Sequence, residues 1–411
     1  MNPSLKNITG RPISSESDFY GREKEIARIW RKLENDHILL LAPRRVGKTS
    51  LMFRLRNEAK SKGSPFTVYL SVAAVKTELD FVKAIYKALL ESPEAHSLSS
   101  RFIHRLKASG IASFLQRIES VGVSEFFEVG LREVPTEEWE IVGHELIAAL
   151  RALEGQWIIM MDELPIFVLD LLRQDPTAKR ARNFLNWFRQ VRQGTPEGES
   201  LRWLLAGSIG LDVVARRHNF SDTINDLLPE TLDAFSVEIS DQFLIALGES
   251  YDLPLSPDVR TRIVERAGWT IPYYLQIFFN SILESCSDER TLPSVQMVDE
   301  VFENLVSPNK RTFFDYWNQR LTEELGKPQD DWARVILKSC ATDPLGATRS
   351  TINQALSSHI ANTEEREDSL NWLLDILISD GYLVHAGASS EGRYRFRSNL
   401  LREFWLRRFA K

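Results

Sequence analysis

Short apolar runs alternate with segments of helical hydrophobic spacing along the first half of the chain. Four runs are apolar enough for strands buried on both faces of a sheet: residues 38–42, 67–72, 157–162 and 201–208. Apolar residues recur at helical intervals over residues 21–34, 49–61, 80–90, 139–153 and 177–193. Strands that alternate with helices predict an α/β fold, in which a doubly wound parallel sheet carries helices on both faces.

The pattern also divides the chain into domains. Residues 1–17 are polar and are expected to form a flexible N-terminus, and residues 18–235 are expected to form the α/β core. Residues 92–136 contain only short apolar pieces and are interpreted as an insertion, partly helical, with a hairpin near 123–133. A helical lid is expected over 236–325 and a C-terminal domain over 326–411.

The loop after the first strand carries the most specific chemical signal. Residues 42–49 nearly match the phosphate-binding pattern G-x-x-x-x-G-K-[ST], with Ala42 in place of the first glycine. Gly47 lets the backbone approach phosphate oxygens, and the amides at the start of the next helix point at the anion. Lys48 is expected to bridge the β- and γ-phosphates and Thr49 to hold Mg²⁺. The alternative is an ordinary strand-to-helix turn with a surface lysine.

Polar residues end two further strands. Asp162 and Glu163 follow the run 157–161, at the sheet edge where α/β folds place ligands. Asp162 is expected to hold Mg²⁺, mostly through water, and Glu163 to orient and deprotonate the attacking water. Ser208, at the end of the fourth run, is expected to sense the γ-phosphate or that water. The alternative is a serine that begins a turn.

Four motifs together resemble those of the archaeal-type P-loop ATPases, STAND-like NTPases related to the AAA+ origin-recognition ATPases. The resemblance extends over nearly the whole chain. The motifs are Phe19-Tyr20-Gly21-Arg22-Glu23-Lys24-Glu25, Pro43-Arg44-Arg45-Val46-Gly47-Lys48-Thr49-Ser50, Asp162-Glu163-Leu164-Pro165 and Gly268-Trp269-Thr270-Ile271-Pro272-Tyr273-Tyr274-Leu275.

The resemblance implies an ATP site built from these motifs. Phe19, Tyr20, Gly21 and Arg22 would lie against adenine, and the P-loop residues 43–50 would hold the phosphates. Pro272, one residue beyond its commonest spacing, would touch the nucleotide from the lid. The lid lacks the arginine that many AAA+ proteins place there, which argues against direct γ-phosphate sensing by the lid. Residues 309–311 resemble the guanine-binding N-K-x-D pattern without its Asp, so adenine is favoured.

The last third of the chain predicts a winged helix, as the resemblance also implies. Helical spacing over residues 331–341, 348–358 and 364–379 is followed by strand-like alternation over 381–385 and 393–397. Winged helices commonly bind DNA, but the third helix begins with an acidic stretch, Glu364 to Asp368, which would repel phosphates. The wing is more basic, and Arg393, Arg395 and Arg397 are its candidate DNA contacts.

Three other basic features have both a functional and a structural interpretation. Lys179, Arg182 and Arg189 lie on one face of the helix 177–193, either as a solvated face or as a contact for DNA or a neighbouring subunit. The C-terminal arginines are interleaved with aromatic residues. They are either part of a basic surface that would contact DNA or part of a final helix that packs its aromatic residues on the protein. Arg216 and Arg217 follow the fourth strand at the distance where related ATPases present an arginine finger to the next protomer; a plain surface role is the alternative.

Composition fits a soluble, cytoplasmic protein without a membrane segment. The 411-residue chain is 43% hydrophobic and 26% charged, and its formal charge of −6 argues against non-specific coating of nucleic acid. Its two cysteines suggest neither a disulfide framework nor a zinc site, and the N-terminus lacks the apolar segment of a signal peptide. No apolar run approaches the roughly 20 residues that cross a bilayer.

The sequence therefore predicts an ATPase that uses ATP and Mg²⁺, with turnover that is slow or stimulated by a partner. Two outputs remain open. In the first, nucleotide state is coupled through the lid and winged helix to a protein partner or to self-association, as in a defence or signalling switch. In the second, the chain is a DNA-binding ATPase or loader. The acidic third helix favours the first output, and the basic wing favours the second.

Overall fold

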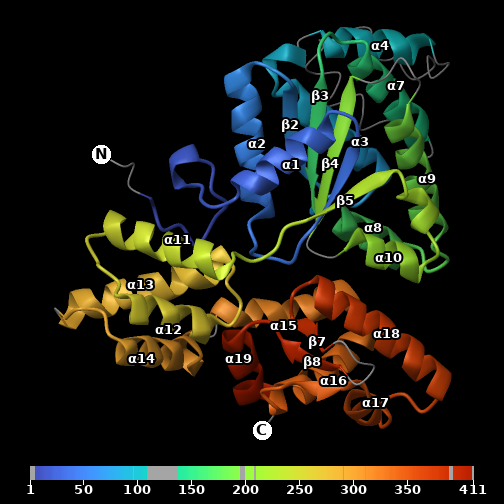
Figure 1. The fold of residues 1–411 in the computed structure, drawn as a ribbon. Helices are drawn as coiled ribbons and strands as arrows, with labels where there is room; N and C mark the ends of the chain where they lie inside the picture. Colours follow the sequence, from blue (N-terminus) through green and yellow to red (C-terminus); the bar gives the residue numbers. More distant parts are fainter. Residues whose placement is uncertain are drawn as a thin grey trace.

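The computed structural model describes residues 5–95, 97–108, 138–194, 200–207, 210–289, 291–310, 312–387 and 392–409. Its elements form an α/β core, a helical lid and a C-terminal unit (Figure 1). Most of the predicted insertion, including the hairpin near 123–133, lies outside the described residues, as does Ser208.

A parallel sheet of five strands forms the centre of the core. Its strand order is β2-β3-β4-β1-β5, and all four neighbouring pairs are parallel. The strands are β1 His37–Leu41, β2 Phe66–Ser71, β3 Trp157–Asp162, β4 Leu201–Gly207 and β5 Leu227–Thr231. The doubly wound parallel sheet expected from the alternation of strands and helices is confirmed, with β5 as an additional edge strand.

Helices cover both faces of this sheet because alternate strand residues point to opposite sides. Leu40 packs in one apolar cluster with α1 and α2, and its neighbour Leu39 packs in a second cluster with α3, α7, α8 and α9. The helices of the core are α1 Glu23–Leu33, α2 Lys48–Lys62, α3 Glu78–Leu90, α4 Leu98–Ala108, α7 Trp139–Arg151, α8 Leu164–Gln174, α9 Lys179–Gln193 and α10 Leu211–Arg217.

The lid consists of α11 Val237–Ser250, α12 Pro257–Ala267, α13 Pro272–Glu289 and α14 Val295–Leu305. Serine side chains cap three of these helices: Ser236, Ser256 and Ser294 each accept a hydrogen bond from the backbone three residues on. In Figure 1 the lid lies beside the N-terminal segment and below the α1–α2 side of the core.

The C-terminal unit combines helices with a small antiparallel sheet of order β6-β8-β7. Its elements are α15 Thr312–Leu325, α16 Gln329–Thr342, β6 Ala347–Thr348, α17 Arg349–Leu356, α18 Thr363–Ser379, β7 Leu383–Ala386, β8 Arg393–Phe396 and α19 Asn399–Phe409. Helix α15, which the sequence analysis assigns to the lid, packs here through edge-on contact of Trp317 with Tyr382 and contact of Phe314 with Phe404. The predicted final helix also packs its aromatic residues inward, since Phe404 and Trp405 are buried.

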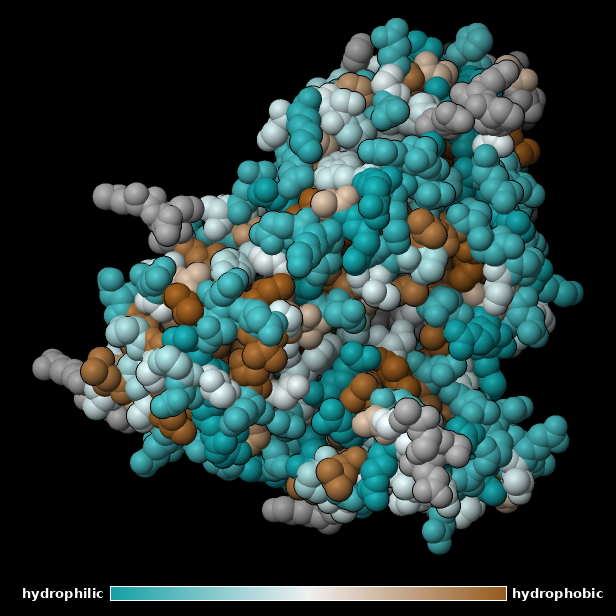
Figure 2. All heavy atoms as spheres, in the orientation of Figure 1, coloured by the Kyte–Doolittle hydropathy of each residue, from teal (hydrophilic) through white to brown (hydrophobic). Residues whose placement is uncertain are grey.

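One apolar cluster continues from the α1–α2 face of the core into the lid and the C-terminal unit. The two smaller units also meet each other, because Asn399 Nδ2 donates a hydrogen bond to the Glu265 carbonyl. Figure 2 shows a mostly hydrophilic face, on which hydrophobic side chains are visible along the border between the core and the two smaller units. Within the described ranges, no helix is both long and apolar enough to cross a membrane.

Candidate nucleotide site

The P-loop connects β1 to α2 and has the backbone of an anion-binding loop. Arg45 and Gly47 both have positive φ, 63° and 108°, and Lys48 begins α2. Alternation of left-handed and right-handed residues turns successive amides to the same side, at the positive end of the helix dipole. Ala42 does not adopt positive φ, so the methyl group that replaces the expected first glycine is tolerated there.

Lys48 lies buried beneath this loop. Its ammonium donates hydrogen bonds to the carbonyl oxygens of Ala42, at 2.6 Å, and Pro43, at 2.9 Å. Burial lowers the pKa of Lys48, while the charges of Glu163 and Asp162 act in the opposite direction. Lys48 Nζ thus donates to neutral carbonyl oxygens, for which phosphate oxygens would be stronger replacements.

Asp162 ends β3 beside the start of α2. The Thr49 hydroxyl donates to Asp162 Oδ2 at 2.7 Å, and Tyr69 of β2 lies with its hydroxyl 3.4 Å from the same oxygen. Burial, and then the charge of Glu163, raise the pKa of Asp162. A buried carboxylate next to a second carboxylate favours a bound cation, and the oxygen donors Thr49 and Asp162 suit Mg²⁺. These residues therefore fit the predicted metal.

Glu163 occupies an unusual backbone conformation at the junction of β3 and α8. Its φ of 63° lies in the left-handed region, which is uncommon for a residue with a side chain. The Glu163 amide donates to Asp162 Oδ1 at 3.0 Å, which helps to hold the turn. Strained residues of this kind gather at functional sites, and Glu163 lines the cavity described next.

A cavity of about 360 Å³ opens in front of the P-loop, within the usual size range of small-molecule sites. It brings together predicted residues from the first motif, the P-loop, the β3 edge and the lid: Phe19, Tyr20, Arg22, Arg44, Arg45, Val46, Gly47, Lys48, Thr49, Ser50, Glu163 and Pro272. Gly21, Pro43 and Asp162 lie next to the lining without belonging to it. Ser208 lies outside the described residues, so its expected role stays a prediction.

The first motif shapes one end of this cavity. Arg22 is buried, donates to the Asp233 carbonyl at 2.7 Å and lies 4.6 Å from the ring centre of Phe235. Gly21 has a φ of 70°, and a Cβ there would lie 2.8 Å from Ile239 of the lid. The motif therefore also joins the core to the lid, in addition to facing the cavity.

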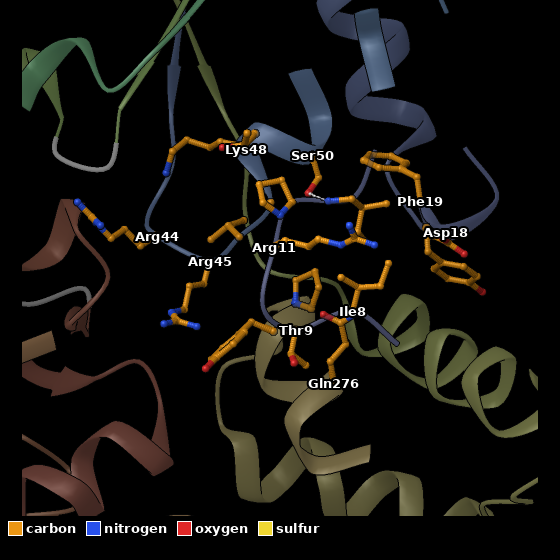
Figure 3. A pocket seen from close by; sticks show the side chains of 18 of the residues that line it. Ile8, Thr9, Arg11, Asp18, Phe19, Arg44, Arg45, Lys48, Ser50 and Gln276 are labelled. Atoms are coloured by element: carbon orange, nitrogen blue, oxygen red, sulfur yellow. Dashed lines mark hydrogen bonds between the residues drawn. The ribbon is translucent and has the colours of Figure 1, made fainter. Parts of the chain in front are cut away.

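The N-terminal segment forms part of the wall, which the sequence analysis did not anticipate. Residues Ile8 to Ile13 line the cavity, and Arg11 extends across it in Figure 3. The Ile13 amide donates to Ser50 Oγ at 3.0 Å, and the Lys6 amide donates to Asp18 at 3.1 Å. The polar composition of this segment predicted flexibility. Its contacts are hydrogen bonds from backbone amides, which require no hydrophobic pattern, so no pattern in the sequence could have revealed them.

The paired P-loop arginines contact different units. Arg45 lies 3.9 Å from the ring centre of Tyr273 in the lid. Arg44 forms an ion pair with Glu324 of α15, with 3.0 Å between Nη2 and Oε1. The Tyr316 ring lies within 6 Å of both guanidinium groups, with centroid distances of 5.3 Å and 5.6 Å. Neither Glu324 nor Tyr316 was predicted, because both are remote in sequence from the motifs.

The arginines of α10 also contact the C-terminal unit. Arg216 pairs with Asp375 of α18 at 2.9 Å, and the Arg217 guanidinium lies 5.1 Å from the ring centre of Trp372 on the same helix. Both groups therefore have partners within their own chain in this conformation. Their role as arginine fingers that act on a neighbouring protomer stays a prediction.

The three wing arginines differ in their surroundings. Arg393 pairs with Asp343 at 2.8 Å, and Arg397 donates to the Leu383 carbonyl and lies 5.7 Å from the ring centre of Trp269. Arg395 is the most exposed of the three. Of the three predicted DNA contacts, Arg395 is therefore the one most available at the surface. On the α9 face, Arg182 is similarly engaged, since it pairs with Asp222.

Comparison with solved structures defines the class of fold. The Walker-type ATPase of Pyrococcus abyssi aligns with a TM-score of 0.62 and 18% identity, over 96% of this chain and 98% of that one. The Aeropyrum pernix ORC2 protein, solved as ADPNP–ADP complexes, aligns with a TM-score of 0.56 and 12% identity, over 97% and 95% of the two chains. No family model and no curated protein matches the sequence.

The chain therefore has the P-loop NTPase fold of AAA+ type found in archaeal origin-recognition and Walker-type ATPases. The similarity extends over nearly the whole length of both chains, so the units that follow the core also have counterparts in these structures. The fold therefore agrees with the resemblance noted from the motifs.

Proposed function

We propose that the protein is a Mg²⁺-dependent ATPase of the archaeal-type P-loop group, acting as a nucleotide switch. The observation that carries the proposal is that Lys48, the Thr49–Asp162 pair and Glu163 meet at one cavity. Phosphoryl transfer to water needs a phosphate cradle, a place for the metal ion and a group that orients the water. These residues provide all three.

Each residue has a defined role in this proposal. Lys48 exchanges the carbonyl oxygens of Ala42 and Pro43 for β- and γ-phosphate oxygens. Thr49 and Asp162 hold Mg²⁺, which supplies charge stabilisation at the phosphates when it is bound. Glu163 orients the attacking water and accepts its proton. Ser208 would complete the site as a sensor of the γ-phosphate or of the water.

Adenine occupies the other end of the cavity in this proposal. Phe19 and Tyr20 line that end, and the Tyr20 ring lies 5.3 Å from Phe243 of the lid. Pro272 and the N-terminal segment complete the wall. Flat apolar side chains of this kind suit a purine ring, so nucleotide binding would bring the lid and the N-terminal segment together around the base.

The output of the switch is the position of the C-terminal unit, which we assign as a winged helix. Its contacts with the P-loop and α10 include the ion pairs Arg44–Glu324 and Arg216–Asp375, and such contacts respond to a nearby anion. A unit that leaves these contacts would offer its α18 face to a protein partner or to another copy of the chain. A cytoplasmic defence or signalling role would use this device.

DNA binding through the wing is the alternative output. Arg395 is its most exposed arginine, whereas Arg393 and Arg397 are engaged within the protein. The acidic start of α18 has a structural explanation as well: the Asn362 side chain caps the helix, and Glu364 and Glu365 complement its dipole. These observations favour the protein-partner output.

The test is a measurement of nucleotide binding and phosphate release by the wild type, with and without Mg²⁺. Lys48→Ala should remove most ATP affinity, because it deletes the buried cation at the phosphates. Lys60→Ala, at an exposed position of the same helix, is the matched control and should bind as the wild type does. Unchanged ATP binding by Lys48→Ala would refute the proposed site.

A further inference from the structure

Arg44 lies at the junction between the nucleotide cavity and a buried cluster of charges in the C-terminal unit. The cluster contains Arg320 and Glu324 of α15 and Asp380, the C-cap residue that follows α18. Arg320 and Asp380 are each 1% exposed, Glu324 is 9% exposed and Arg44 is 17% exposed. Arg44 is the member of this set that also lines the cavity.

Ion pairs connect the four residues in a chain. Arg44 pairs with Glu324, Glu324 also pairs with Arg320, and Arg320 Nη1 lies 3.2 Å from Asp380 Oδ1. Two arginines thus balance two carboxylates away from water. If Arg44 were withdrawn, two buried carboxylates would share one arginine, and such an uncompensated charge is unstable in a protein interior.

The backbone brings this cluster directly onto the P-loop. Gly381, which follows Asp380, has a φ of 91°, and a Cβ built on it would lie 2.8 Å from Pro43 Cβ and 2.7 Å from Trp269. Burial raises the pKa of Asp380, while the charges of Arg320, Arg44 and Lys48 act in the opposite direction. The carboxylates of the C-terminal unit therefore lie within electrostatic reach of the P-loop cations.

Arg44 has hydrogen-bonding capacity that its protein partners leave unused. Its Nε is buried and has no hydrogen-bond partner among the described residues. Its guanidinium extends from the P-loop toward the C-terminal unit in Figure 3, whereas Lys48 remains against the loop. An arginine offers five donors in a planar fork that matches phosphate as well as carboxylate.

We infer that Arg44 exchanges anionic partners, pairing with Glu324 when the C-terminal unit is docked and with the terminal phosphate when ATP is bound. This role rests on the proposed ATP site. ATP would take Arg44 from the charge cluster, and the excess negative charge left on Glu324 and Asp380 would then release the C-terminal unit from the P-loop. ADP lacks the terminal phosphate and would leave the ion pair in place.

Arg44 and Arg45 have separate tasks in this exchange. Arg45 stacks on Tyr273 of the lid, so this contact depends on lid closure, which either nucleotide would cause. Arg44 would distinguish triphosphate from diphosphate and transmit that difference to the C-terminal unit. The arginine that the lid lacks at its usual place would thus be replaced by one within the P-loop itself.

The experiment compares the affinities for ADP and for the β,γ-imido analogue of ATP, measured by calorimetry with Mg²⁺. Arg44→Ala should lower the preference for the ATP analogue roughly tenfold or more, the effect of losing a charge-assisted hydrogen bond. Glu324→Gln keeps the shape of its side chain but frees Arg44, so it should raise that preference by about five- to tenfold. Glu323→Gln, an exposed neighbour on α15, should leave it unchanged.

The double variant distinguishes exchange from independent effects. If Glu324 acts through Arg44, Arg44→Ala combined with Glu324→Gln should behave as Arg44→Ala alone. Additive effects, or an unchanged preference in Arg44→Ala, would overturn the exchange while the ATP site itself could still stand. If the wild type binds neither nucleotide, or if Lys48→Ala binds both normally, the proposed function fails and the exchange fails with it.

Discussion

The Thr49 hydroxyl donates a hydrogen bond to Asp162, with 2.7 Å between Oγ1 and Oδ2. This contact joins the first turn of α2 to the end of β3, 113 positions apart in sequence. Glu163 follows in a left-handed conformation that turns the chain into α8. The proposed metal-binding pair and the proposed base therefore meet at the end of β3, and their roles can be separated by substitution.

Glu163→Gln should retain ATP binding and slow hydrolysis by roughly 10²–10⁴-fold, because it removes the group that accepts the proton from water. Binding is measured with a fluorescent ATP analogue and turnover by phosphate release. Asp162→Asn should instead weaken Mg²⁺-dependent binding as well as turnover. A Glu163→Gln protein that hydrolyses ATP near the wild-type rate would exclude Glu163 as the base.

A disulfide can test whether the C-terminal unit must move. A Cβ built on Gly210, the residue before α10, lies 2.7 Å from Ser379 Oγ at the end of α18. Cysteines at both positions are close enough to bond once the Asp212 side chain, 2.5 Å from the same Cβ, turns away. Oxidised Gly210→Cys/Ser379→Cys should lose affinity for the ATP analogue, roughly tenfold, with little change for ADP. Reductant should restore the affinity, and the single-cysteine proteins are the controls.

The native thiols should not interfere with this measurement. Both Cys286 and Cys340 are buried, and burial raises the pKa of Cys340 to about 12. Because both thiols are buried, they are expected to be unreactive in the folded protein. If oxidation leaves ATP binding unchanged although the engineered bond has formed, release of the α10–α18 contact is not linked to ATP.

Arg216→Ala and Arg217→Ala test whether active sites are shared between protomers. If one of these arginines acts in trans, its substitution should lower turnover, and mixing with Glu163→Gln protein should restore part of it. The alternative is that these arginines hold the C-terminal unit in place through Asp375 and Trp372. Their substitution should then loosen that unit and raise basal turnover independently of protein concentration. Turnover that is insensitive to both substitutions contradicts both roles.

The wing arginines test the DNA output. If the wing binds duplex DNA at low salt, replacing Arg393, Arg395 and Arg397 together by Ala should weaken binding and reduce the salt slope by about 0.9 for each phosphate that the wing no longer neutralises. The single Arg395→Ala should then account for most of the weakening, because Arg395 is the most exposed member. No binding by wild type with ATP present would remove the DNA interpretation.

Local patterns predict much of the core and of the phosphate end of the site. The apolar runs of β1 to β4 and the P-loop each leave a signal within a few consecutive residues, and the structure confirms the parallel α/β fold. Strand β5 was missed because Pro229 and Glu230 interrupt its apolar pattern. Pro229 is tolerated because β5 is an edge strand, where a missing amide donor need leave no partner unpaired. The buried Glu230 is tolerated because it pairs with Arg28 and Lys32 of α1.

The contacts between units could not be predicted from local patterns. Arg44 and Glu324 are 280 positions apart, and Leu5, whose amide donates a hydrogen bond to Ser250 Oγ, is 245 positions from that serine. An ion pair or a hydrogen bond of this kind requires only one residue at each end and imposes no periodicity. Pairing Arg44 with Glu324, or the N-terminal segment with the cavity, therefore needs the three-dimensional structure.

The most direct test of the switch is fluorescence energy transfer between the core and the C-terminal unit. Glu91 in the core and Lys338 on α16 are exposed and can carry dyes after substitution by Cys, in a Glu163→Gln background that binds ATP without rapid turnover. The account predicts that ATP with Mg²⁺ changes the transfer efficiency, that ADP does not, and that Arg44→Ala abolishes the difference. The same efficiency without nucleotide, with ADP and with ATP would contradict the account.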